Sequence, residues 1–364
     1  MTRSAHLFRK VFVALLLAVT LLASVVPMER VVTAQDSECT IEWPSGTLQI
    51  MAPAAPGGGW DTTAREIQRV IGEEQIVSGD VEVFNVEGAG GTIGLAELVN
   101  EHAGDENIMM VMGLVMVGGI ALSVSPVTLD QVTPLARLTT EFEVIVVPVD
   151  SRYQTLDDLL VDFKADPGSV SFGGGSAGGT DNILVGLMAQ AVGVDPTQVN
   201  YVPFSGGGEA LASVLGGQTS AGVSGLGEWA AQIESGELRA LAISGRANSG
   251  AAGGTPVGGD ATPDVSGTPV VQSALAASIP SLQEQGVDLE LANWRGIVAA
   301  PDVSPEARAC MLDAIDTLVT SAGWQEALTT NGWTNFYLPG DDYAAYLQEQ
   351  IQTVNQTLTD LGLI

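Results

Sequence analysis

The stretch that decides the fold is Pro53-Ala54-Ala55-Pro56-Gly57-Gly58-Gly59-Trp60-Asp61. The apolar run 48–52 precedes it, and a helical pattern that begins near Thr62 follows it. We therefore predict a strand, a glycine turn and the start of a helix. Glycine permits positive φ and a close approach of the backbone to a ligand. The first amides of a helix lack partners within the helix, so such a turn can bind an anion without a basic side chain.

Similar turns recur along the chain. Strand-like runs lead into three further glycine clusters, 88–94, 173–181 and 203–208, and a helical pattern follows each cluster. Strands separated by helices indicate a parallel sheet that is covered on both faces. In such sheets ligands bind at the carboxyl ends of the strands, where these turns lie. An ordinary strand-to-helix connection is the alternative reading of any single turn.

The rest of the pattern continues this alternation. It predicts further strands over 108–112, 143–148, 220–223, 238–243 and 293–301, and helices over 153–163, 304–321 and 341–361.

The chain begins with the features of an export signal. Arg3, Arg9 and Lys10 precede the apolar run 11–26, and small residues lead to a predicted cleavage site after Ala34. An uncleaved anchor is the alternative, but the run is shorter than the roughly 20 residues that span a bilayer. The 364 residues suggest about two domains.

The chain is strongly acidic, with a net charge of −30. Removal of residues 1–34 takes away four basic residues and one acidic residue, which leaves −33. Such a charge argues against nucleic acid and anionic membranes as partners. If the ligand is an anion, local backbone dipoles have to overcome this unfavourable field.

Cys39 and Cys310 are the two cysteines. Export permits a disulfide between them, and two buried free thiols are the alternative. The sequence has no Cys/His cluster for a metal. We predict no metal site and no cofactor.

The segment Gly174-Gly175-Ser176-Ala177-Gly178 fits the Gly-x-Ser-x-Gly pattern of a serine hydrolase. That fold requires a histidine after the serine, and both histidines, His6 and His102, precede Ser176. A hydrolase that uses Ser176 is therefore the less favoured reading, and we predict that the chain is not an enzyme.

Several acidic residues lie near the predicted strand ends, namely Asp61, Glu141, Glu143, Asp181 and Glu228. Paired carboxylates can perform acid–base chemistry. Acids near helix N-termini more often cap the helix or complement its dipole, which fits Asp61 and Asp181. Glu228 could bind a ligand amine or lie in solvent at a helix start.

Taken together, the motifs resemble the receptors of tripartite tricarboxylate transporters, also called Bug receptors. The first glycine turn matches their Pro-Gly-Gly loop. Further matches follow in the expected order over residues 45–362, at Asn85 with 88–94, at 204–210 with 215–218, at 236–242 and at 294–296.

The resemblance implies an α/β fold of the two-lobed periplasmic-binding-protein type (type II, Venus flytrap). Each lobe has a mostly parallel sheet flanked by helices. Residues 35–142 and 249–364 form lobe 1 and residues 143–248 form lobe 2. The Gly/Thr/Pro-rich segment 247–273 is predicted to be a flexible insertion, and residues 1–34 form the signal peptide.

The resemblance also implies a function. A monomeric periplasmic or extracytoplasmic receptor would capture a small organic carboxylate between its lobes and deliver it to a membrane permease of the tripartite type. The carboxylate could be a di- or tricarboxylate, an aromatic acid or an amino acid. A sensory receptor that presents the same ligand to a membrane kinase is the alternative.

The family's ligand carboxylate is held by backbone amides and ordered waters. This agrees with the absence of lysine and arginine from the glycine turns, so we expect no basic side chain at the site. The predicted ligand-binding residues are Pro56, Gly57, Gly58, Gly59, Trp60, Asp61, Gly90, Gly91, Thr92, Ser176, Ala177, Gly178, Thr180, Ser205, Gly206, Gly207, Gly208 and Glu228.

Overall fold

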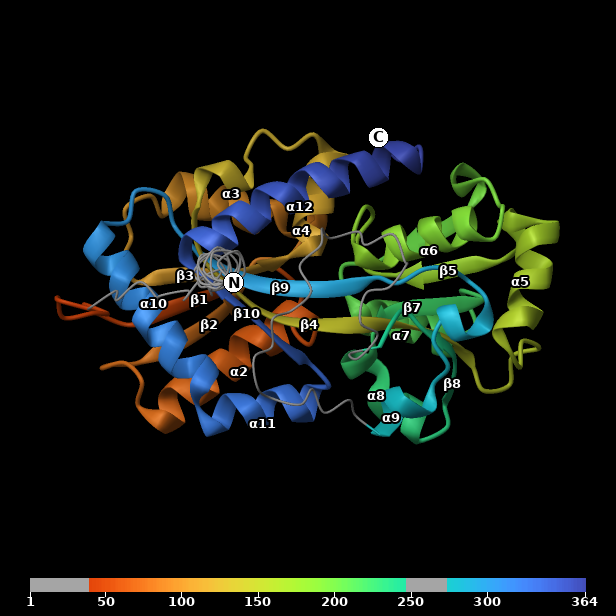
Figure 1. Ribbon diagram of the computed structural model, residues 1–364, viewed down its shortest axis with the longest axis horizontal. Helices are drawn as coiled ribbons and strands as arrows, with labels where there is room; N and C mark the ends of the chain where they lie inside the picture. Colours follow the sequence, from red (N-terminus) through yellow and green to blue (C-terminus); the bar gives the residue numbers. More distant parts are fainter. Residues whose placement is uncertain (1–38, 247–273) are drawn as a thin grey trace, which may run out of the picture. The chain divides into compact units, whose positions relative to one another are not determined.

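The long strand β4 (Thr133–Pro148) belongs to both halves of the fold. Its first part pairs with β9 (Ala292–Ala299) and β10 (Thr334–Pro339), and its last part pairs with β7 (Ala221–Gly225) and β8 (Leu238–Ile243). β4 therefore joins two lobes, as Figure 1 shows. The predicted two-lobed α/β fold is confirmed.

The structure is a computed structural model that describes residues 39–246 and 274–364. These residues all belong to one unit, Ser37–Ile364. The predicted signal segment 1–34 and the predicted insertion 247–273 lie outside the described residues. The residue boundaries of the two lobes stay predictions.

Each lobe contains a small parallel sheet. In the first lobe β1 (Leu48–Ala52) pairs with β2 (Val81–Asn85) and β3 (Ile108–Gly113). In the second lobe β5 (Ser171–Gly174) pairs with β6 (Asn200–Pro203) and β7. The pairings of β4 and β9 are antiparallel, and the full order is β2-β1-β3-β9-β4-β7-β5-β6.

Helices cover both faces of the sheets. In the first lobe α3, α4 and α12 lie on one face, and α2, α10 and α11 lie on the other (Figure 1). The bounds are α2 (Gly59–Glu74), α3 (Thr92–Glu101), α4 (Leu114–Ser123), α5 (Leu156–Ala165), α6 (Thr180–Ala191), α7 (Gly207–Leu215), α8 (Leu226–Glu234), α9 (Ala274–Ser278), α10 (Pro305–Thr320), α11 (Ala322–Asn331) and α12 (Gly340–Asp360). Within residues 39–246 and 274–364, none of these helices combines the length and apolar character that a bilayer crossing requires.

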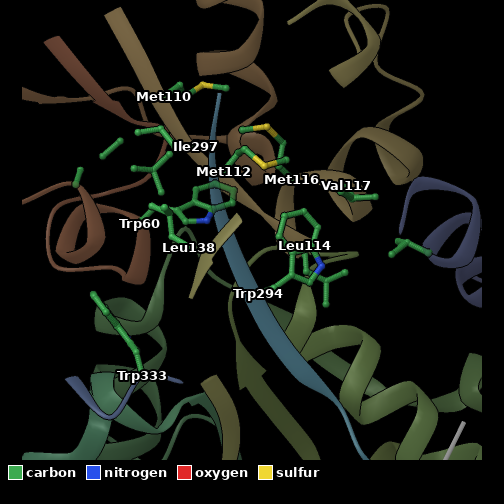
Figure 2. Close-up of a cluster of buried hydrophobic side chains, with 14 of the residues drawn as sticks. Trp60, Met110, Met112, Leu114, Met116, Val117, Leu138, Trp294, Ile297 and Trp333 are labelled. Carbon is green, nitrogen blue, oxygen red and sulfur yellow. The ribbon is translucent and has the colours of Figure 1, made fainter. Parts of the chain in front are cut away.

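A methionine-rich core lies behind the first glycine turn. All six residues of β3 are buried, as expected for a central strand covered on both faces. Figure 2 shows Met112 and Met116 beside the indole of Trp60. The Trp60 ring is 7% exposed, so the turn is anchored in the core of the first lobe.

The predicted elements differ from the observed ones in a few places. α2 begins at Gly59 instead of Thr62, and β4 begins ten residues before the predicted strand 143–148. Residues 114–123 form α4, an apolar helix that the sequence did not predict. Side chains cap two of the predicted helices, Thr155 on α5 and Ser304 on α10.

Cys39 and Cys310 form a disulfide that ties the start of the described chain to α10. The bridge closes a loop of 271 residues. Cross-links over long loops restrict the unfolded chain and typically contribute about 2–4 kcal/mol.

We expect Cys39→Ser, Cys310→Ala and the double variant to lower the unfolding temperature by the same amount, because each removes the same bridge. Thermal unfolding by circular dichroism measures the shift, and dithiothreitol should reproduce it in the unchanged protein. A double variant that is much less stable than either single variant would contradict this, since the two thiols would then contribute separately.

Candidate functional site

Helices from both lobes begin at one place with their first amides uncapped. Their N-cap residues are glycines without a side-chain cap, Gly58 on α2, Gly179 on α6, Gly206 on α7 and Gly225 on α8. Side-chain caps are present on α5 from Thr155, on α10 from Ser304 and on α11 from Ser321, whereas α3, α4 and α12 also begin without one. The first N–H groups of an uncapped helix are free donors with a partial positive charge. Four such ends meet at the candidate site.

The uncapped helix starts surround a cavity of about 80 Å³. Its lining comes from both lobes: Pro53, Ala54, Gly58, Gly59, Trp60, Gly88, Gly90, Gly91, Val115, Gly175, Ser176, Gly179, Thr180, Asp181, Ser205, Gly206, Gly207, Ser224, Gly225, Glu228, Asn293 and Arg295.

Acidic side chains brace three of the glycine turns. The amide of Gly57 donates to Asp61 at 2.8 Å, that of Gly175 donates to Asp181 at 2.6 Å, and that of Ser205 donates to Glu209 at 3.0 Å. In each case the acid lies in the first turn of the following helix. It folds the loop back over the helix start without capping the helix, so the first helical amides stay open.

The structure brings most of the predicted site residues together. Those that line the cavity are Gly58, Gly59, Trp60, Gly90, Gly91, Ser176, Thr180, Ser205, Gly206, Gly207 and Glu228. Those that do not line it are Pro56, Gly57, Asp61, Thr92, Ala177, Gly178 and Gly208.

Some of the residues outside the cavity have structural roles. Asp61 also accepts hydrogen bonds from Arg65 and Asn85, and the Thr92 hydroxyl donates to the Ala89 carbonyl at 2.9 Å. Ala177 lines an adjoining hollow of about 470 Å³, which shares Ser176 with the cavity.

Ser176 has no histidine beside it in the cavity. The described residues that line the cavity include no histidine. His102 lies at the end of α3, with Nδ1 3.5 Å from an oxygen of Asp105. A Ser–His pair is therefore not assembled at Ser176.

The expectation of a site without a basic side chain is wrong, because Arg295 of β9 lines the cavity. Arg295 is 2% exposed, and its Nη2 forms an ion pair with Glu141 of β4. The same Nη2 lies 4.0 Å from Glu228 Oε1. The four glycine turns contain no basic residue, whereas Arg295 reaches the cavity from the middle of an antiparallel strand.

Other lining residues were also missed. Some of them lie in the predicted glycine turns, beside residues that were predicted, and others lie in α4, β7 and β9. The lining residues that were not predicted are Pro53, Ala54, Gly88, Val115, Gly175, Gly179, Asp181, Ser224, Gly225 and Asn293. Asn293 is held by the second lobe, because Thr180 Oγ1 lies 3.1 Å from its Oδ1. The motif at residues 294–296 contains Arg295, but the motif alone did not indicate that Arg295 lies at the cavity.

Three carboxyl groups, those of Glu141, Glu228 and Asp181, lie near the Arg295 guanidinium, and Glu143 lies beside these carboxyls. Burial raises the pKa of Glu228 to about 8, and the nearby charge of Glu141 adds to this. Burial also raises the pKa of Asp181 to about 6, and it raises the pKa of Glu143 well above the ordinary value. Even so, no group of three or more potential metal ligands in the described residues is arranged to hold a metal ion.

We expect the ligand-free protein to become less stable as the pH rises from 6 to 8.5. A carboxyl whose pKa is raised on folding adds stability below its unfolded pKa of 4.5, and that stability is lost as the pH rises through the folded value of about 8 for Glu228. The unfolding temperature should fall by at least about 1.5 °C, which corresponds to roughly 1 kcal/mol for a chain of this length.

Thermal unfolding at constant ionic strength measures this slope, and Glu228→Gln should make it shallower. An unfolding temperature that rises over this range, or a slope that Glu228→Gln leaves unchanged, would contradict the raised pKa.

Relatives of the chain are found by sequence. Residues 64–256 match the family described as tripartite tricarboxylate transporter family receptor. A UPF0065 protein of Agrobacterium vitis is 26% identical over 83% of this chain and 77% of its own length. The protein BugT of Bordetella pertussis is 24% identical over 85% of this chain and 87% of its own length.

Solved structures share the fold. MatC from Rhodopseudomonas palustris, solved with bound malate, is 21% identical with a TM-score of 0.69, over 88% of this chain and 99% of that chain. The periplasmic binding protein BugD is 18% identical with a TM-score of 0.71 over the same shares. The match to the family covers more than half of the sequence. The chain belongs to the tripartite tricarboxylate transporter receptor family.

Proposed function

We propose that the chain is an extracytoplasmic receptor that captures a small organic carboxylate between its two lobes and delivers it to a membrane permease. The observation that supports this best is the set of uncapped helix starts around one cavity. Family membership and the malate bound to MatC agree with it.

Backbone amides suit a ligand that has to be bound and released. Each helix start carries roughly half a positive charge, and the free N–H groups donate directly to an oxyanion. These donors act at short range, so they can attract an acid although the chain after removal of residues 1–34 has a net charge of −33. The lining amides come from both lobes, so the acid stabilises the arrangement in which the lobes meet.

The two lobes are in contact beside the cavity. α4 of the first lobe packs on the loop before α6 of the second, and a Cβ at Gly118 would overlap the Gly178 carbonyl oxygen. A ligand that binds both lobes favours this closed state by its differential affinity for it. The permease would then recognise the closed form.

We propose that no chemical step takes place in the cavity. Ser176 lacks a histidine partner among the described lining residues, and its place beside the helix start of α6 fits a hydrogen-bonding role. The family to which the chain belongs consists of solute receptors.

Gly207→Ala tests the site, because a Cβ there would overlap Glu228 Oε2 and lie 3.0 Å from Ser224 Oγ. The displaced Glu228 side chain would occupy the cavity, so we expect affinity for carboxylates to fall at least tenfold, or about 1.4 kcal/mol. A thermal-shift screen of di- and tricarboxylates, aromatic acids and amino acids identifies a ligand, and calorimetry then measures its affinity.

Gly208→Ala is the matched control. Gly208 is the next residue of the same helix turn, does not line the cavity, and has open space where a Cβ would lie. The Gly208→Ala variant should bind carboxylates as tightly as the unchanged protein. If Gly207→Ala and Gly208→Ala bind the ligand equally tightly, the ligand binds elsewhere. If no compound in the screen shifts the unfolding temperature, the proposed function is contradicted.

A further inference from the structure

Arg295 has a hydrogen-bond donor that the described protein does not use. Its side chain is 3% exposed, and Nη2 is engaged by Glu141 Oε1. Nη1 is buried and has no hydrogen-bond partner in the described part of the chain. A buried donor left without a partner costs about 1–3 kcal/mol, and more when it is charged. An acceptor from outside the chain would remove this cost.

The chemistry of the missing acceptor follows from the guanidinium. Arginine presents a planar fork of donors that matches a carboxylate. Glu141 contacts Nη2 with one oxygen, Nη1 has no partner among the described residues, and Arg295 is one of the residues that line the cavity. Arg295 is the only basic residue among the described residues that line the cavity. The Arg295 side is therefore suited to an anionic group that is separate from the one at the helix starts.

The cavity offers two places for an anionic group, the uncapped helix starts and Arg295. One carboxylate would then meet the amides of α2 and α7, and the other would meet Arg295.

We propose that Arg295, held in place by Glu141, is the specificity-determining residue of this receptor and selects dicarboxylates over monocarboxylates. This inference rests on the proposed function, since it assumes that an acid binds in the cavity.

Glu228 affects the same subsite. Its Oε1 lies 4.0 Å from Arg295 Nη2, and Glu141, Glu143, Asp181 and Ser224 are its other polar neighbours. Because the pKa of Glu228 is raised to about 8, this side chain is mostly neutral at pH 7 and can donate to a ligand carboxylate. Above pH 8 it becomes an anion that repels the ligand and competes for Arg295.

Calorimetric titration with succinate and butyrate tests the inference, because the two probes differ by one carboxylate. The test variant is Glu141→Gln/Arg295→Gln, which removes both partners of the buried ion pair together and leaves the net charge unchanged. Arg308→Gln is the control for removal of an arginine outside the cavity, since Arg308 lies at the surface and pairs with Asp341. Thermal unfolding establishes that each variant is folded.

We expect the unchanged protein and Arg308→Gln to bind succinate at least tenfold more tightly than butyrate at pH 7. The double variant should bind both probes with affinities within about threefold of each other. If the double variant keeps the preference for succinate, or if the unchanged protein has none while still binding monocarboxylates, the role of Arg295 is overturned and the proposed function stands. If no carboxylate binds at all, the proposed function fails first.

A second arm compares pH 7 with pH 9, where succinate stays a dianion. Its affinity for the unchanged protein should fall at pH 9, and Glu228→Gln should bind equally at both values. A tighter complex with L-aspartate than with succinate, accompanied by proton release, would show instead that Glu228 binds a ligand amine, and it would overturn the dicarboxylate assignment.

Discussion

The free N–H groups at the starts of four helices are the feature on which the rest of the site depends. Glycine at each N-cap leaves these donors uncapped, while Asp61, Asp181 and Glu209 hold the preceding turns in place from inside the helices. An ordinary N-cap side chain would satisfy one of the donors and gain roughly 1 kcal/mol of stability. The fold omits this stabilisation at the cavity and keeps it at helices such as α5 and α10.

The buried charges beside these helix starts are balanced. Arg295 and Glu141 form a buried pair, and the pKa of Glu228, raised to about 8, keeps this carboxyl mostly protonated near neutral pH. Burial also raises the pKa of Glu143 well above its ordinary value. Without protonation of Glu228, a further carboxylate beside the guanidinium would repel an acid. A very acidic chain can thus provide a cavity that is locally favourable for an anion.

The sequence predicted those parts of the fold that depend on local chemistry. The Pro53–Asp61 turn and the clusters at Ser176 and Ser205 were recognised because glycine after a strand and before a helix has few other uses. Most of the residues in these turns line the cavity. Asp61 does not, because its carboxylate faces the turn, and a carboxylate in a loop does not reveal in the sequence which way it points.

The missed parts depend on pairing between distant segments. Arg295 reaches the cavity only because β9 pairs antiparallel with β4, which places Asn293 opposite Glu141. No local pattern gives that register. The helix α4 was missed for a different reason, since a buried segment composed almost wholly of apolar residues and glycine shows no clear period of 3.6 residues.

We propose that main-chain amides from both lobes hold the acid, and a crystal structure of the protein with bound succinate would show whether they do. We expect ligand oxygens within about 3.2 Å of first-turn amide nitrogens from at least one helix of each lobe. An acid held by side chains alone, or bound outside this cavity, would contradict it.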